Sequence, residues 1–118
     1  MKKLILLVLL LAGCSAQAKE EGLVVTLEAS DEQVEAFEPV KFTAVVTHNG
    51  EVVTEGADIF FELIKEEEYT IGTVNPTNAG DGKYIVETSF DEAGVYKVIS
   101  HVTVNGLHEM PFVKVELK

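Results

Sequence analysis

Short segments in which apolar and polar residues alternate make up most of the chain, and residues typical of turns separate them. Between 40 and 48, Val40 and Phe42 alternate with Lys41 and Thr43, which would bury one face of the segment and leave the other solvated. The pattern predicts β-strands over 23–29, 40–48, 51–54, 57–65, 69–74, 83–90, 95–104 and 107–117. Short strands at such even spacing are typical of a sandwich or a barrel.

Two Asn-Gly pairs mark the sharpest predicted turns. Asn49-Gly50 and Asn105-Gly106 each separate two strand segments by two residues. A type I′ turn needs positive φ at both central residues, which Asn and Gly tolerate, so each pair predicts a tight hairpin. Gly80-Asp81-Gly82 and Ala93-Gly94 mark two further turns.

The segment from Asp91 to Tyr96 resembles the tyrosine corner of immunoglobulin-like sandwiches, in which a Tyr hydroxyl bonds back to nearby backbone. Val98 stands where an immunoglobulin domain has its second cysteine, so the resemblance is one of architecture. We therefore predict an all-β fold over residues 23–118: an immunoglobulin-like β-sandwich of about seven antiparallel strands.

The chain opens with two lysines and an unbroken apolar run over 4–11, which is too short to cross a bilayer and is typical of a secretory signal. The run closes with Leu11-Ala12-Gly13-Cys14, which resembles a bacterial lipobox. In a lipobox the cysteine becomes the lipidated first residue of the mature protein. We therefore expect a lipoprotein signal peptide over 1–13 and lipidation of Cys14.

Residues 15–22, SAQAKEEG, are polar and predict a flexible tether, so that 14–22 comprises the lipidated cysteine and its tether. Two or three acyl chains on Cys14 would anchor the domain at the outer face of the cell membrane. The alternative is a soluble export signal cleaved nearby, in which Cys14 has no such role.

The chain is acidic, with 20 Asp and Glu against nine Lys and Arg, all of them Lys, and a net charge of −11. Loss of residues 1–13 would remove two lysines and make the charge −13. Such a surface is unsuited to nucleic acid, which needs clustered cations. Cys14 is the only cysteine, so no disulfide can form within the domain, and packing must hold its core. The largest core side chains are expected to be Phe42, Phe60, Phe61 and Phe90.

The stretch HVTVNGLHEMP, from His101 to Pro111, places two of the three histidines and one of the two methionines around a single turn. A two-residue loop makes Thr103 face His108 and makes His101 face Met110. Paired residues project from the same face, so these four side chains would lie together on the outer face. The opposite, core face would consist of Tyr96, Val98, Val102, Val104, Leu107, Val113, Val115 and Leu117.

Two imidazoles and a thioether suit a soft or borderline metal, and the thioether favours copper, especially Cu(I), over zinc or calcium. Ile99 and Phe112 would flank the cluster and shield it from water. The hairpin therefore predicts a copper site formed by His101, His108 and Met110.

The same hairpin also has a purely structural interpretation. His and Met occur on solvated sheet faces without any ligand, and three donors leave a tetrahedral site incomplete. Pro111 cannot donate to the ladder, so it either breaks one hydrogen bond or forces a bulge that turns Met110 to the other face. Spacing alone leaves both interpretations open.

Residues 23–118 resemble the YtkA-like, or FixH-like, domain of small bacterial membrane-anchored proteins and lipoproteins. The matching stretches are 37–42, 61–65, 82–84, 93–96 and, most distinctively, HVTVNGLHEMP. The resemblance implies an immunoglobulin-like fold and a role in copper handling and cytochrome oxidase assembly, and its His…His-x-Met pattern falls on His101, His108 and Met110. The sequence departs from the family between Glu66 and Asn78, which contain neither Met nor His, so no fourth ligand is implied there.

Other residues are weaker candidates for a functional site. His48 ends a strand at the rim with core-side parity, which favours a structural role, and 66–68 (EEE) is typical of a solvated loop. No nucleophile elbow, phosphate loop or zinc-protease motif is present in the sequence, so we do not expect an enzyme.

Two hypotheses follow. In the first, a monomeric, lipid-anchored domain binds copper for transfer to an acceptor or a membrane-protein partner. In the second, it is a non-metal interaction module that docks on a membrane complex.

Overall fold

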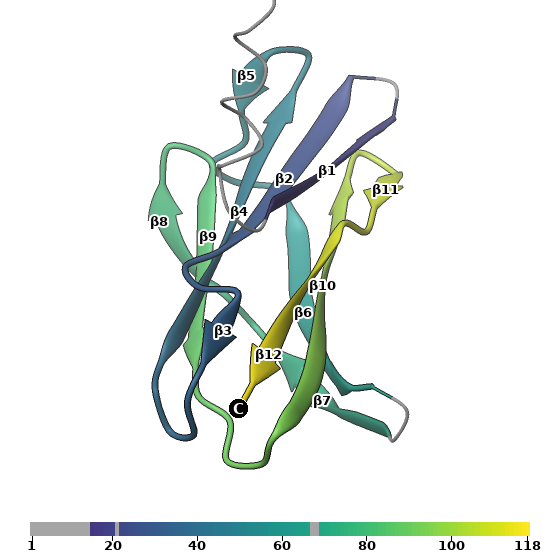
Figure 1. The fold of residues 1–118 in the computed structure, drawn as a ribbon. Coiled ribbons are helices and arrows are strands. Elements are labelled where there is room, and N and C mark those ends of the chain that lie inside the picture. The colour runs from purple at the N-terminus through teal and green to yellow at the C-terminus, as the bar shows by residue number, and fades with distance from the viewer. Residues whose placement is uncertain (1–14, 21, 67–68) are drawn as a thin grey trace, which may run out of the picture.

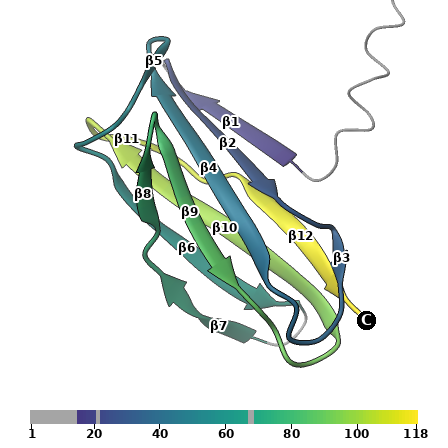
Figure 2. The same cartoon turned by 90° about the vertical axis from the view of Figure 1, so that its left-hand side faces the viewer.

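The computed structural model describes residues 15–20, 22–66 and 69–118, and these form two β-sheets that pack face to face (Figures 1 and 2). The first sheet has the strand order β1 (Ser15–Glu20), β2 (Leu23–Ala29), β4 (Val40–His48), β9 (Lys83–Thr88) and β8 (Thr77–Gly80), with β5 (Glu51–Val52) paired to β4. The second has the order β3 (Gln33–Val34), β12 (Phe112–Leu117), β10 (Gly94–Val104), β6 (Asp58–Lys65) and β7 (Tyr69–Val74), with β11 (Leu107–Glu109) paired to β10. The predicted immunoglobulin-like β-sandwich is confirmed.

Some predicted strands match the structure from end to end and others do not. β2, β4 and β7 have the predicted bounds, whereas the predicted segment 107–117 divides into β11 and β12 around Met110 and Pro111. β1, β3 and β8 were not predicted. All described pairings are antiparallel except that of β3 with β12, which is parallel.

The core lies between the sheets and is formed by every second residue of the central strands. Phe42 of β4 and Phe61 of β6 are its largest fully buried side chains. The expectation that Phe60 belongs to the core is wrong, because adjacent residues of a strand point to opposite faces. Phe60 faces outward on the second sheet and is 37% exposed.

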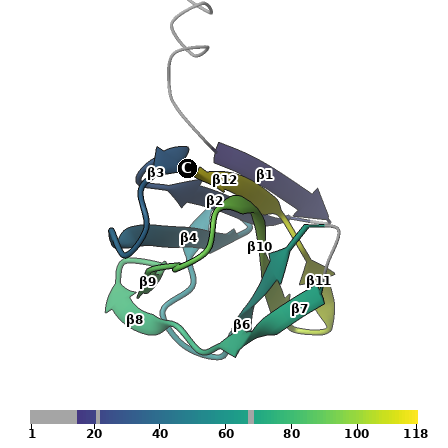
Figure 3. The ribbon, with the colours of Figure 1, turned by 60° about the horizontal axis from the view of Figure 1, so that its bottom comes forward.

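The predicted tether over 15–22 is also wrong for most of its length. Residues Ser15–Glu20 form β1, which pairs with β2 along its whole length, from Ser15 opposite Glu28 to Glu20 opposite Leu23. Figure 3 shows β1 at the edge of the first sheet, beside β12 of the second. Cys14 and the predicted signal peptide over 1–13 lie outside the described residues. Within the described residues there is no helix of the length and hydropathy needed to cross a membrane.

The turn predictions are confirmed by the backbone. Asn49 and Gly50 have φ of 54° and 85°, and Asn105 and Gly106 have φ of 51° and 82°, as type I′ turns require. All three residues of Gly80-Asp81-Gly82 also have positive φ.

The tyrosine corner is present. Tyr96 is 2% exposed and its hydroxyl donates a 2.6 Å hydrogen bond to the carbonyl oxygen of Glu92. The ring stacks on Phe90 with centroids 4.1 Å apart, and burial raises the pKa of Tyr96. Glu92 in turn accepts a 2.8 Å hydrogen bond from Lys65 of β6, so the corner is tied to the neighbouring strand.

Candidate metal centre

The hairpin register places the predicted ligands on the outer face of the second sheet. Thr103 pairs with His108, and the same register continues through β12, where Ile99 pairs with Phe112. Pro111 therefore interrupts the ladder without a bulge, and its carbonyl oxygen still accepts a 3.0 Å hydrogen bond from the Ser100 backbone. Met110 keeps its outward orientation and is 50% exposed.

His101 is the more enclosed of the two histidines. Its side chain is 16% exposed, and its ring stacks on Phe60 of β6 with centroids 4.5 Å apart and planes 11° from parallel. Its Nε2 lies 3.0 Å from Oε1 of Glu62, whose side chain is 25% exposed. The other oxygen of Glu62 accepts a 3.3 Å hydrogen bond from Thr70 of β7. Neighbouring strands thus hold both the ring plane and one ring nitrogen.

His108 is exposed and has a simpler environment. Its Nδ1 lies 2.7 Å from the hydroxyl oxygen of Thr103, the residue directly opposite it in the hairpin. Both residues belong to the hairpin, so this contact depends on the register of the hairpin.

The two rings lie at a separation that suits a shared ion. The centroids of His101 and His108 are 5.8 Å apart and their planes differ by 39°. A metal–imidazole bond of about 2 Å allows two rings on one ion to keep their centroids roughly 5–6 Å apart. The separation of the two rings is therefore the one that a shared ion would require, and Met110 is exposed on the same face.

The predicted flanking residues Ile99 and Phe112 occupy that face as a cross-strand pair, with Ile99 half-buried and Phe112 44% exposed. The ammonium group of Lys97 lies 4.3 Å from the centroid of the Phe112 ring, in cation–π geometry. One side of the Phe112 ring is thus occupied by a cation, and its exposed remainder contributes apolar surface near the histidines.

The donor set is incomplete within the described part of the chain. Among residues 15–20, 22–66 and 69–118, no three His, Cys, Asp or Glu side chains lie close enough together to hold a metal ion. Thr70, which lies between Glu66 and Asn78, donates a hydrogen bond to Glu62. A metal bound here would need the thioether of Met110 and a further donor from outside the described cluster.

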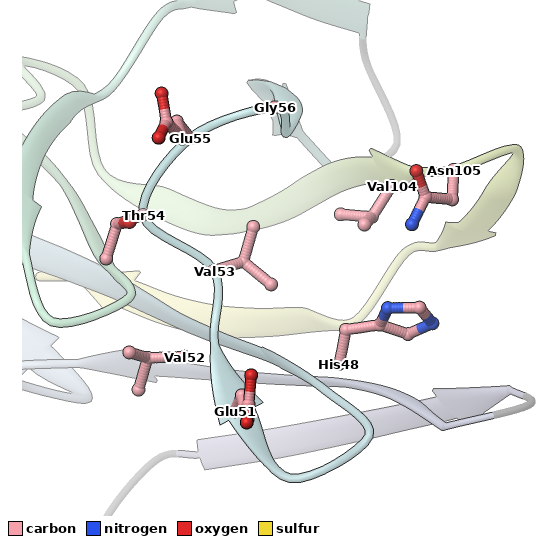
Figure 4. A pocket seen from close by; sticks show the side chains of 9 residues that line it. All are labelled: His48, Glu51, Val52, Val53, Thr54, Glu55, Gly56, Val104 and Asn105. Atoms are coloured by element: carbon pink, nitrogen blue, oxygen red, sulfur yellow. The ribbon is translucent and has the colours of Figure 1, made fainter.

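His48 lies elsewhere, at the rim of an open pocket of about 290 Å³ beside the first hairpin (Figure 4). Glu51, Glu55 and Asn105 line the same pocket. The single imidazole is therefore accompanied in this pocket by two carboxylates and one amide.

Two residues of the candidate centre were missed from the sequence: Phe60, which stacks on His101, and Glu62, which bonds it. Their contact with His101 depends on how β6 pairs with β10, a long-range register that no short turn fixes. The alternation in β6 was a usable signal, because Phe60 and Glu62 share a parity opposite to that of the buried Phe61.

Comparison with known proteins identifies the family of the chain. The sequence profile described as YtkA-like matches residues 17–101. The chain belongs to the YtkA-like family. The match includes His101 but ends before His108 and Met110, so two of the three predicted ligands lie beyond the matched part of this YtkA-like protein. No curated protein matches the sequence.

Two solved structures share the fold. The soluble domain of PmoD from Methylocystis sp. ATCC 49242 (Rockwell) is 12% identical, with a TM-score of 0.59 over 89% of this chain and 98% of that one. A superoxide reductase (neelaredoxin) from Ignicoccus hospitalis is 14% identical, with a TM-score of 0.53 over 87% of this chain and 83% of that one. At these identities the YtkA-like domain shares an architecture with both.

Proposed function

We propose that this protein is an extracytoplasmic lipoprotein whose domain binds copper as Cu(I) through His101, His108 and Met110. The single observation that carries the proposal is the pair of imidazole rings, 5.8 Å apart on an outer sheet face that also presents a thioether. Imidazole and thioether ligands favour copper over harder cations. Copper handling is also what the resemblance to the YtkA-like family implies.

The openness of the cluster suits transfer better than storage. Met110 and His108 are exposed, so an incoming ligand can reach the ion without unfolding of the domain. The three donors leave a tetrahedral ion one ligand short, and a copper acceptor that supplies the fourth could take the ion by exchange. In this proposal copper is cargo, delivered to a membrane partner such as a respiratory oxidase, and no chemical reaction is catalysed.

Anchoring through Cys14 would keep this exchange at the outer face of the membrane. Radiolabelled palmitate supplied to cells that express the chain should enter the wild type and not a Cys14→Ala variant. Label in both would contradict the anchor, while copper binding would stand on its own test.

A Cu(I) competition titration tests the metal site, with the full chain in a Cys14→Ser background because a free thiol would bind Cu(I) itself. The expected result is one tightly bound ion per chain, with affinity reduced at least 10-fold by His108→Ala and by Met110→Leu. His48→Ala is the matched control and should leave the affinity unchanged. Equal affinity in all variants would contradict the proposal.

A second function is favoured by the exposed apolar side chains on the same face, Phe60, Met110 and Phe112, which are 37%, 50% and 44% exposed. Such a group is typical of surfaces that bind proteins, so the face could serve as a metal-independent interaction module. The titration separates the two functions, since the module requires no copper.

A further inference from the structure

The two histidines of the candidate centre differ in the chemistry of the group that holds them. Glu62 holds His101 and Thr103 holds His108. We propose that Glu62 is a positioning residue: it fixes the neutral His101 ring with its proton on Nε2, which leaves the lone pair of Nδ1 as the metal donor. This inference rests on the proposed copper site for its purpose, but its test does not require copper.

The first step is the hydrogen-bonding capacity of the two partners. An ionised carboxylate only accepts hydrogen bonds, so a 3.0 Å contact between Glu62 and Nε2 requires the proton to be on Nε2. A neutral imidazole carries one N–H and one lone pair, so the lone pair must then be on Nδ1. A ring nitrogen has to present its lone pair to bind a metal, and His101 is thus set in the form that binds through Nδ1.

The second step is that Glu62 itself is held. One carboxylate oxygen contacts His101 and the other accepts the hydrogen bond from Thr70, so both sides of the carboxylate are engaged. With only 25% of its side chain exposed, Glu62 is partly shielded from water. The stack on Phe60 fixes the plane of the ring, and a flip of the ring within that plane would turn Nε2 away from Glu62 and break the hydrogen bond.

The third step is the contrast with His108. The Thr103 hydroxyl can donate to Nδ1 or accept from it, so their 2.7 Å contact is compatible with either tautomer. Only the tautomer in which His108 donates to Thr103 leaves Nε2 free for a metal. His101 is therefore held in its metal-binding tautomer before an ion binds, whereas His108 can adopt its metal-binding tautomer when the ion binds.

A carboxylate that accepts the second N–H of a metal-binding histidine is a common arrangement, and its removal typically weakens metal affinity about 10- to 100-fold. Glu62→Gln is the best variant, because the amide keeps the shape of the side chain and the bond to Thr70. Unlike the carboxylate, the amide can either accept from Nε2 or donate to it, so it no longer dictates the tautomer.

The first measurement is the pair of imidazole ¹⁵N chemical shifts of His101, taken on the metal-free full chain in the Cys14→Ser background at a pH where the ring is neutral. The wild type should show the proton on Nε2, and Glu62→Gln should show a mixture of tautomers. Glu87→Gln, on β9 of the other sheet, is the matched control and should match the wild type. A wild-type ring protonated on Nδ1, or an unchanged tautomer in Glu62→Gln, would overturn the inference.

Cu(I) affinity is the second measurement, and it distinguishes positioning from direct ligation by Glu62. If Glu62 positions the ring, Glu62→Gln should weaken Cu(I) binding about 10- to 100-fold together with the change in tautomer. Weaker binding with an unchanged tautomer would show that Glu62 acts as a ligand and would overturn the inference. A wild type that shows the expected tautomer but binds no Cu(I) would instead refute the proposed function, while the role of Glu62 in fixing the ring would stand.

Discussion

Strand β10 begins and ends in two different environments (Figure 2). Near its start, the hydroxyl of Tyr96 is bonded to backbone, its ring is stacked on Phe90, and the nearby Glu92 is paired with Lys65. Near its end, His101 and His108 lie close together on the outer face, where Met110 is also exposed. In the first region the polar groups bond to other groups of the fold. In the second region the thioether of Met110 and neighbouring apolar side chains are exposed to solvent.

This difference predicts which residues contribute to stability and which to binding. Buried and mutually bonded groups stabilise the corner, so their loss should lower the free energy of unfolding. Donors on the outer face of a sheet contribute less to folding, because water can partly replace their contacts. Substitutions at the two ends should therefore separate into effects on stability and effects on binding.

The largest effect is expected for Phe90→Ala at the corner. Phe90 is 6% exposed and stacks on Tyr96, so truncation leaves a cavity and should lower the free energy of unfolding by about 3–5 kcal/mol. His101→Ala at the other end should cost less, about 1–2 kcal/mol, because it removes a single hydrogen bond to Glu62 at the outer face of the sheet. Urea unfolding followed by circular dichroism measures both. Similar losses in the free energy of unfolding of the two variants would contradict the expected separation of stability from binding.

Tyr96→Phe should have an intermediate effect. It removes the hydroxyl that bonds the Glu92 carbonyl and should cost about 1–2 kcal/mol at neutral pH without changing Cu(I) affinity. The pKa of Tyr96 is raised above 10.0 by burial, so the wild type should lose stability as the pH rises through that raised pKa. The Phe variant lacks this alkaline loss, which unfolding curves between neutral and alkaline pH can detect. A fall in Cu(I) affinity would instead show that the two regions are coupled.

Ser100→Ala is expected to have a smaller effect, of opposite sign. Ser100 lies in β10 between the two regions, is fully buried, and its Oγ has no hydrogen-bond partner in the described structure. Removal of a buried polar atom without a partner should leave stability unchanged or raise it by up to about 1 kcal/mol. Thermal unfolding measures the change. A clear loss of stability would mean that the hydroxyl has a partner, such as an internal water.

Glu92→Gln should give the smallest effect, visible only in acid. The hydrogen bond from Lys65 and its charge lower the pKa of Glu92 below the usual value of 4.5. A carboxyl with a lowered folded-state pKa adds stability above its unfolded pKa and loses it as the pH falls through the folded pKa. Wild type and variant should therefore differ slightly at neutral pH and converge below about pH 4.5. A difference that persists at lower pH would assign the effect to something other than this ion pair.

The sequence predicts local features of both regions well. The tyrosine corner and the hairpin each depend on contacts within a few residues, and a two-residue turn fixes its register. Glu62 and Phe60 could not be assigned to His101, because β6 and β10 are far apart in sequence and either could have shifted by two residues without exposing its core face. β1 was missed because SAQAKE contains no β-branched or aromatic residue and no apolar residue larger than alanine, so its composition gives little indication of a strand.

The early start of β1 has a geometric consequence for the proposed lipid anchor at Cys14. The strand begins at Ser15 and is paired from that residue on. A lipid on Cys14 would therefore be attached directly to the edge of the sandwich, with no flexible linker between the lipid and the sheet. The bilayer would then restrict the tumbling of the whole domain. The pairing of β1 with β2 would then set the orientation of the β10–β11 hairpin relative to a membrane partner. A substitution that detaches β1 would make this orientation variable and would leave His101, His108 and Met110 unchanged.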